Sequence, residues 1–489
     1  MVRPAPDGAD WNGNWSHIRG PGETGGTRRV SHKRTGDGCE STGDLDVLSG
    51  FVRRAVFASL AIVVAGATDS FGQTPLTLAE AMRRAATMTP ASRALTAAAD
   101  EAGERVQQAR SGYFPRLDVT ESVQRGDHPV FVFSSLLSQQ RFTAANFAID
   151  ALNRPAPVTN VRTALSVEQA IFDGGLTRLA VESAEIGRDL VATRMRGAQQ
   201  DLALGAARVF LQVLQLESMA RANEAAVEAA ESDLARARAR RDVDLVTDAD
   251  VLDMEVHLAD MRARQLATTA EVAVARIRLN EAIGTALDEV QVLVPPEAPQ
   301  ASPAADALIR AAQAARSDRR DADLRTLMAA NDRRTAQAAF LPRLGVQGGW
   351  EFNGATLTDQ RSSWIIGAQV QLNLFRGFGD VARIAEARYA ETRARAERER
   401  VERTIEVEVR AALARLDAAR ARQRVGEAAL ERARESQRIV RDRYDSGLAT
   451  IADLLRAAGA VIDAESRATA ARMDAIGESV ALDRAAGRL

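Results

Sequence analysis

The chain has little of what builds catalytic or metal-binding sites. A single cysteine, Cys39, occurs among 489 residues, which excludes a disulfide framework and a cysteine-based metal cluster. The four histidines are scattered along the sequence without the spacing of metal ligands. Aromatic residues make up only 4% of the chain, which is low for an enzyme core and ordinary for long alanine-rich helices. No nucleophile, metal or phosphate-binding pattern appears, so the sequence predicts neither an enzyme nor a cofactor.

The chain also lacks a charge of one sign. Its formal net charge is −2, although 27% of the residues are charged. A nucleic-acid-binding domain normally carries an excess of basic residues on one face. We therefore expect no nucleic-acid partner.

The front of the chain has the pattern of a secretory signal. In residues 53–72, two arginines precede an apolar run of about eleven residues and a small-residue cleavage site. This run is too short for a membrane-spanning helix, which needs about 20 residues. No cysteine follows the cleavage site, so we expect no lipid anchor. Residues 1–52 are glycine-rich and polar, and we expect them to be disordered or to lie upstream of the true start.

The rest of the chain contains the same unit twice. The segment Ala109–Val119 returns as Ala336–Val346, and Asp244–Leu252 returns as Gly447–Leu455. The offset of the second pair is 203 residues (450 − 247, at its threonines). Because this period is far longer than that of solenoid repeats, it indicates a duplicated domain-sized unit. The two copies span residues 76–293 and 305–487, and a linker rich in proline and alanine, residues 294–304, joins them.

Each copy contains a long heptad-like helical stretch. Apolar or small residues recur at alternating steps of four and three, a pattern typical of coiled coils. These positions are Leu202, Ala206, Val209, Val213, Leu216 and Ala220 in the first copy, and Val401, Ile405, Val409, Leu413, Leu416 and Ala419 in the second. At 1.5 Å per residue, each stretch would form a rod of roughly 100 Å.

Between the helices the apolar period changes from 3.6 to 2, which predicts two strands in each copy. The strands are expected at about 115–124 and 161–172, and at about 342–352 and 364–375. Alternation of apolar and polar residues over about ten positions is typical of a transmembrane β-barrel. Gln369, Gln371 and Asn373 fall on the polar side and are expected to face the lumen.

Four strands are too few to close a barrel, which takes about eight. An unclosed sheet edge is prohibitive in lipid, because each unpaired backbone group costs several kcal/mol. The barrel must therefore be shared between chains, as a dimer with eight strands or a trimer with twelve. Only the trimer leaves an aqueous channel. The alternative is a soluble coiled-coil protein decorated with two hairpins.

The order of these motifs resembles the TolC-like outer-membrane efflux proteins over residues 76–487. The resemblance rests on Phe-Pro-Arg-Leu and Phe-Leu-Pro-Arg-Leu at the strand entries, Phe-Asp-Gly-Gly and Phe-Arg-Gly-Phe at the strand exits, and two Thr-x-x-Asp turns. It implies a mostly α fold with some β structure, and a homotrimer. In the trimer, a twelve-stranded barrel in the outer-membrane lipid continues into a periplasmic α-helical barrel.

The resemblance also implies a function and partners. TolC-like proteins are the exit ducts of tripartite efflux pumps or type I secretion systems. Such a duct docks with a periplasmic adaptor and an inner-membrane transporter of the RND, ABC or MFS class. The second hypothesis is a periplasmic coiled-coil adaptor or structural protein, which would carry one hairpin between β-rich halves and no duplicated strands. Cargo is selected at the transporter, so the sequence identifies neither the exported substrate nor the pump class.

The two Thr-x-x-Asp turns are candidates for the periplasmic gate. Thr247 and Thr450 are expected to cap the helices that follow, with Asp250 and Asp453 three residues on, as in a capping box. The resemblance implies in addition that these turns line the periplasmic aperture and that Asp453 belongs to an acidic constriction. One turn further on, where the relative with the best-known gate has a second acid, this chain has Arg456.

The resemblance implies a bridge between neighbouring hairpins as well. Tyr444 and Asp250 match positions that make this bridge in that relative, so a Tyr444–Asp250 hydrogen bond is the gate hypothesis. Asp253 and Arg456 belong to the same candidate gate, or they pair as an ordinary surface contact.

Overall fold

The computed structural model describes residues 75–297 and 304–489. The predicted signal peptide, residues 53–72, and the segment 1–52 lie outside the described residues. The same holds for residues 298–303, which form most of the predicted linker.

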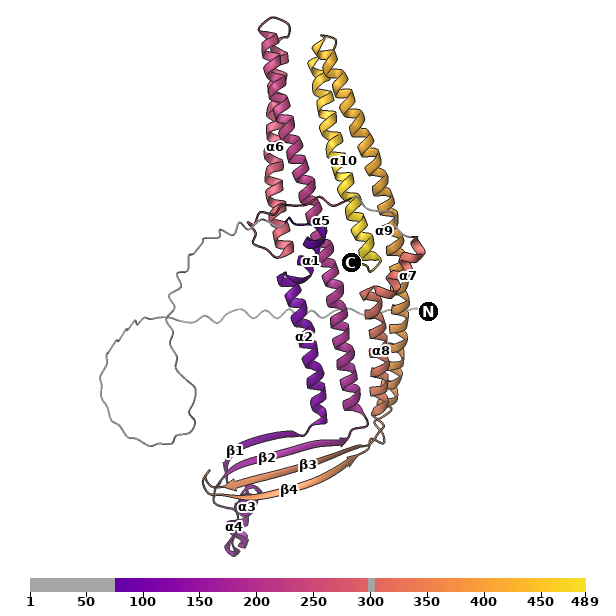
Figure 1. Ribbon diagram of the computed structural model, residues 1–489. Helices are drawn as coiled ribbons and strands as arrows, with labels where there is room; N and C mark the ends of the chain where they lie inside the picture. The colour runs from indigo at the N-terminus through magenta and orange to yellow at the C-terminus, as the bar shows by residue number, and fades with distance from the viewer. Residues whose placement is uncertain (1–74, 298–303) are drawn as a thin grey trace, which may run out of the picture. The chain divides into compact units, whose positions relative to one another are not determined.

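The predicted helix–strand–strand–helix unit occurs twice, which confirms the fold class (Figure 1). The first copy consists of α1 Leu78–Thr87, α2 Pro90–Arg110, η1 Ser111–Tyr113, β1 Arg116–Gly126, β2 Val158–Phe172, α5 Leu176–Arg241 and α6 Asp248–Ile283. Between β1 and β2 lie α3 Pro129–Ser138, η2 Ala144–Phe147 and α4 Ile149–Asn153. The second copy consists of α7 Ala305–Ala315, α8 Ser317–Ala338, β3 Arg343–Gly354, β4 Gln360–Gln371, α9 Gly379–Asp445 and α10 Ile451–Ala485.

Two helices dominate the architecture. α5 has 66 residues and α9 has 67, so each is about 100 Å long at 1.5 Å per residue. α6 folds back along α5 and α10 along α9, which gives two antiparallel hairpins. The lower halves of the long helices, towards the strands, are flanked by α1 and α2 on α5 and by α7 and α8 on α9.

The two copies bury matching apolar positions of their long helices. In α9, Ile405, Val409 and Leu416 are fully buried against α7 and α10. In α5, Phe210 and Val213 are fully buried against α1, α6 and α10. Val213 and the three α9 residues lie on the stripes seen in the sequence, which places one stripe of each helix in a core. Phe210 lies one position beyond the predicted Val209, which is only partly buried.

The strands form one antiparallel sheet in the order β1-β2-β3-β4. Its two outer strands, β1 and β4, each have one partner within the described chain. The β2–β3 ladder joins the two copies and carries an irregularity between Ala170 and Phe172.

The last strand ends earlier than the sequence suggests. β4 runs from Gln360 to Gln371, not from about 364 to 375, because its final pair is Arg343 with Gln371 and β3 begins there. Asn373, expected in the barrel wall, lies beyond the strand. Its amide donates to the carboxylate of Asp380 in the first turn of α9, so it fixes the junction of strand and helix.

Candidate functional site

The sheet has one polar and one apolar face. Pairing in register puts Arg116 opposite Glu168, Glu168 opposite Gln347, and Gln347 opposite Gly367, all on one face. Gln369 and Gln371 have the same strand parity as Gly367, so both predicted lumen residues share this face.

The opposite face is apolar and exposed. Val119, Ile366 and Val370 lie on it, and Trp364 is 72% exposed. Monomeric soluble proteins rarely expose contiguous apolar patches larger than a few hundred Å². A face of this kind needs a cover of lipid or protein.

The other candidate site is the far end of the two hairpins, where the long helices reverse. Both turns place one residue in the left-handed region, Asp244 with φ 58° and Gly447 with φ 75°. Thr247 then caps α6 and Thr450 caps α10, as the spacing predicts. Each threonine hydroxyl accepts from the backbone N–H three residues on, and the aspartate there accepts from the threonine backbone N–H.

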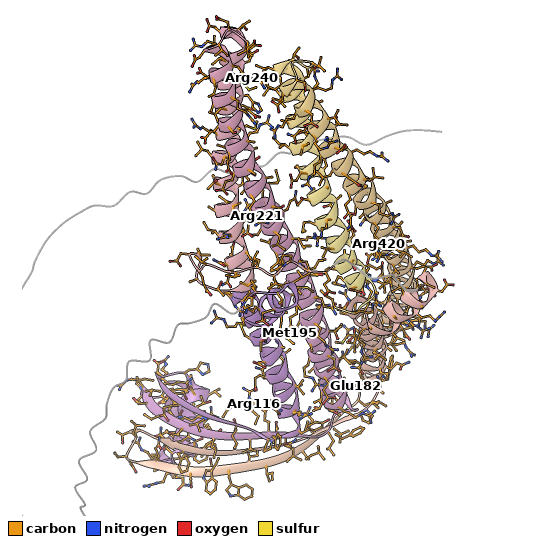
Figure 2. All side chains as sticks on the ribbon, turned by 45° about the horizontal axis from the view of Figure 1, so that its top comes forward. Arg116, Glu182, Met195, Arg221, Arg240 and Arg420 are labelled. Carbon is orange, nitrogen blue, oxygen red and sulfur yellow. The ribbon has the colours of Figure 1, made fainter. Side chains whose placement is uncertain are left out.

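Tyr444 lies between the two hairpins near this end. Its side chain is only 9% exposed and packs in a cluster with Met254, Ile451 and Leu454. The guanidinium of Arg240 lies 4.7 Å from the centre of the Tyr444 ring. Figure 2 shows Arg240 near the end of α5, far from Arg116 at the start of the sheet.

The predicted Tyr444–Asp250 hydrogen bond is not formed within the chain. The Tyr444 hydroxyl has no hydrogen-bond partner among the described residues. Asp250 instead accepts from the Thr247 backbone N–H at 2.9 Å and the Thr247 hydroxyl at 2.8 Å, because it completes the cap of α6.

Arginines make the polar contacts between the two hairpins at this end. Arg240 donates to the Asp445 carboxylate at 3.0 Å and to the Tyr444 carbonyl at 3.4 Å. Lower down, Arg441 of α9 pairs with Asp233 of α5 at 3.3 Å. We call these four charged residues and the Tyr444 ring the tip latch. The sequence offered no signal for Arg240, Asp233 or Arg441, because each is one charged residue among many on helices rich in ion pairs.

Asp453 and Arg456 pair with each other. The Arg456 guanidinium lies 3.0 Å from the Asp453 carboxylate. The hydroxyl and backbone N–H of Thr450 hold the pKa of Asp453 below its usual range, and Arg456 adds to the effect. The alternative contact between Asp253 and Arg456 is not formed among the described residues, where Arg456 pairs with Asp453 of its own helix. Asp253 is exposed on the first turns of α6.

The described residues hold no metal centre: no group of His, Cys, Asp and Glu side chains among them is arranged to bind a metal ion. Across residues 75–297 and 304–489, no helix has both the length and the apolarity needed to cross a membrane.

The fold is that of solved bacterial outer-membrane channels. The outer membrane protein VceC of Vibrio cholerae superposes with a TM-score of 0.66 at 19% identity, covering 84% of this chain and 96% of VceC. A membrane protein from Pseudomonas aeruginosa gives 0.70 at 19% identity, covering 84% and 93%. The CmeC outer membrane channel of Campylobacter jejuni gives 0.68 at 16% identity, covering 84% and 85%. Among curated proteins, none matches the chain in sequence.

The duplicated unit, the open sheet and the two long hairpins define a channel-forming class of protein. The family model "Outer membrane efflux protein" matches residues 82–285 and 308–488, so the chain belongs to the outer membrane efflux protein family. The family consists of channels, not enzymes, and places the chain in the outer membrane with its helical part in the periplasm. The alternative of a periplasmic adaptor is thereby overturned.

Proposed function

We propose that three copies of this chain form a twelve-stranded outer-membrane barrel that serves as the passive exit duct of a tripartite efflux or type I secretion system. The observation that carries the proposal is the open sheet of four strands with one exposed apolar face. β1 and β4 each offer a free row of backbone donors and acceptors, which lipid cannot satisfy. Pairing β1 of one copy with β4 of the next removes every edge.

The far end of the hairpins suits a partner protein. Leu245 and Leu448 occupy matching positions in the two tip turns, and both are largely exposed. Exposed leucines on a charged helical rod favour contact with another protein. The expected partner is a periplasmic adaptor, which would connect the duct to an inner-membrane transporter of the RND, ABC or MFS class.

The same end is the proposed gate. The tip latch joins the two hairpins of one chain through contacts that a small rotation of either hairpin would break. Tyr444 belongs to this latch, and its hydroxyl is buried without a partner among the described residues, so a Tyr444–Asp250 bridge would form only after the tip rearranges. Asp453 would stand at the aperture together with Asp250 and Asp253. Because Arg456 pairs with Asp453, the aperture would be less acidic than a ring of two unpaired carboxylates.

Two arginine substitutions on opposite faces of β4 test the barrel. Trp364→Arg puts a charge on the apolar face, where arginine costs about 2–4 kcal/mol at the middle of the bilayer. Gln369→Arg puts the same charge on the polar face. We expect the wild type and Gln369→Arg to fractionate with the outer membrane and to migrate as a trimer until heated, whereas Trp364→Arg loses most of both properties. Equal behaviour of the two variants, or a monomer in the soluble periplasm, would contradict the barrel.

A further inference from the structure

The connection between β1 and β2 is a folded structure at the outer end of the sheet. It contains α3, η2 and α4, and its centre is a chain of aromatic contacts. Phe133 meets Phe142 edge-on at 4.7 Å, and Phe142 meets Phe147 edge-on at 5.1 Å. The corresponding connection in the second copy, between Gly354 and Gln360, is a short turn. Each chain therefore carries one such folded segment, residues 127–157, which we call the outer cap.

Buried amides fix the outer cap to the sheet. Gln139, at the end of α3, is 2% exposed, and its amide nitrogen donates at 2.9 Å to both the Thr159 carbonyl and the Asn160 side chain. Asn160 in turn donates to Asn353 of β3 at 2.9 Å. A buried amide ladder of this kind is costly to break, because each freed group would stay buried without a partner.

The ladder identifies the face of the sheet to which the outer cap is attached. Asn160 has the same parity along β2 as Glu168, and Asn353 has the same parity along β3 as Gln347. These residues belong to the polar face, which also carries Gln369. Gly126 of β1 lies on the same polar face, and a Cβ there would meet the Phe131 ring of the outer cap at 3.7 Å. The outer cap thus leans over the polar face and away from the apolar one.

The outer cap also presents apolar side chains that no other residue of the described chain covers. Ile149 is 75% exposed, and Val130, Leu137 and Phe147 are exposed as well. Lipid is on the wrong side to cover them, since the outer cap is anchored to the opposite face of the sheet. In the proposed trimer, three outer caps are held over one lumen by the same ladder, so each has two others as its nearest apolar neighbours.

We propose that the outer caps of three chains pack against one another through these residues and close the outer mouth of the barrel. The inference rests on the proposed trimer. The occupant of each exposed apolar surface is a second copy of the same segment. The duct then has two closures in series, the outer caps at the cell surface and the tip latch in the periplasm, and both must open for export.

Cysteine cross-linking tests the contact directly, because the chain has no cysteine after Cys39. In a Cys39→Ser background, Ile149→Cys should form a disulfide between copies on mild oxidation and appear as a dimer on a non-reducing gel. Thr356→Cys, exposed in the β3–β4 turn of the same mouth, is the matched control and should stay monomeric. If Ile149→Cys fails to fold, Phe147→Cys replaces it. A cysteine at 149 that never cross-links overturns the proposal, whether it labels freely with a maleimide, which means that nothing covers the surface, or is protected, which means that a foreign protein covers it.

Conductance tests the closure. The full chain is reconstituted in planar bilayers with the tip latch weakened by Arg240→Gln. Replacing residues 127–157 by Asn-Gly, a favoured two-residue hairpin turn, should then raise conductance several-fold. Oxidising Ile149→Cys in the same background should lower conductance, and reductant should restore it. If the protein stays trimeric and in the outer membrane, but neither the loop replacement nor the oxidation changes its conductance, the outer closure alone is refuted. Loss of the trimer in the wild type would refute the proposed function instead.

Discussion

Substitution of Arg240 is the most direct test of the tip latch. Arg240→Gln keeps most of the side-chain length but removes the charge that lies over the Tyr444 ring and pairs with Asp445. If the latch holds the periplasmic end closed, the variant should open more readily than the wild type. The quantity to measure is the mean conductance of the reconstituted trimer, with its open probability where single channels are resolved.

The size of the effect follows from the two charge-dependent interactions that the substitution removes, those with Asp445 and with the Tyr444 ring. The ion pair with Asp445 is partly exposed and contributes about 0.2–1 kcal/mol. The interaction with the ring contributes about 0.5 kcal/mol at an exposed site and about 2 kcal/mol at a desolvated one, and Tyr444 is largely buried. The closed state of each chain is therefore destabilised by about 1–3 kcal/mol, which changes the ratio of closed to open states by about 5- to 150-fold.

A neighbouring arginine provides the control. Arg238 lies two residues earlier on α5 and pairs with Glu255 of α6 at 2.6 Å, within one hairpin. Arg238→Gln makes the same change of charge without touching the contact between hairpins, so its conductance should stay close to that of the wild type. Asp445→Asn should reproduce only the smaller, ion-pair share of the Arg240→Gln effect. Opening by Arg238→Gln as large as that by Arg240→Gln, or no opening by Arg240→Gln, would refute the latch.

Two further predictions concern stability. Gly174 and Gly175 both have positive φ (72° and 83°), but a Cβ at Gly174 would lie 2.8 Å from Leu341 Cβ, whereas a Cβ at Gly175 meets nothing within 4 Å. Gly174→Ala should therefore lower the temperature at which the trimer dissociates more than Gly175→Ala, by an overpacking cost of about 1–3 kcal/mol, and equal shifts would show that the site relaxes. Burial lowers the pKa of His257 below its ordinary value of 6.5, although Asp260 and Asp233 oppose the shift. The imidazole thus contributes stability that is fully present above pH 6.5 and is lost as the pH falls through the lowered pKa. Thermal unfolding followed by circular dichroism should show that the unfolding temperature falls less between pH 7.5 and pH 5 for His257→Gln than for the wild type. An equal fall in the two proteins would contradict this role.

Most of the fold could be predicted from the sequence, because the periodicities of its helices and strands are local. The heptad-like stripe that contains Ile405 and Val409 lies in the core of the second copy. Thr247 and Thr450 cap helices where the Thr-x-x-Asp spacing puts them. The end of β4 was less accessible, since apolar alternation continues through Leu374 while the strand stops at Gln371. A strand can pair only as far as its partner extends, so the end of β4 depends on where β3 begins.

The contacts at the tip and at the outer mouth could not be predicted in the same way. Arg240 meets residues 204 and 205 positions later, and this pairing depends on the register of two coiled-coil hairpins. Gln139 meets Asn160 because the outer cap folds back on the sheet. Neither contact leaves a period or a motif in the sequence. The resemblance points to these turns as a gate, which stays a proposal; within one chain the Tyr444 hydroxyl has no partner and Asp250 caps α6.

The two copies differ at the tip latch, because only the second copy has an aromatic ring there. A shift of 203 residues maps Arg240 onto Arg443, but it maps Tyr444 back onto Arg241, so the first copy has no ring for an arginine to lie on. In the proposed trimer six hairpins meet at six seams, three within chains and three between them. Each seam within a chain has the Arg240–Tyr444 contact. At each seam between chains, pseudo-symmetry brings Arg443 towards Arg241 of the next copy, a like-charged pair. The seams between chains are therefore the weaker ones, so opening should begin there, and full opening should then break the Arg240–Tyr444 contact at each seam within a chain as well.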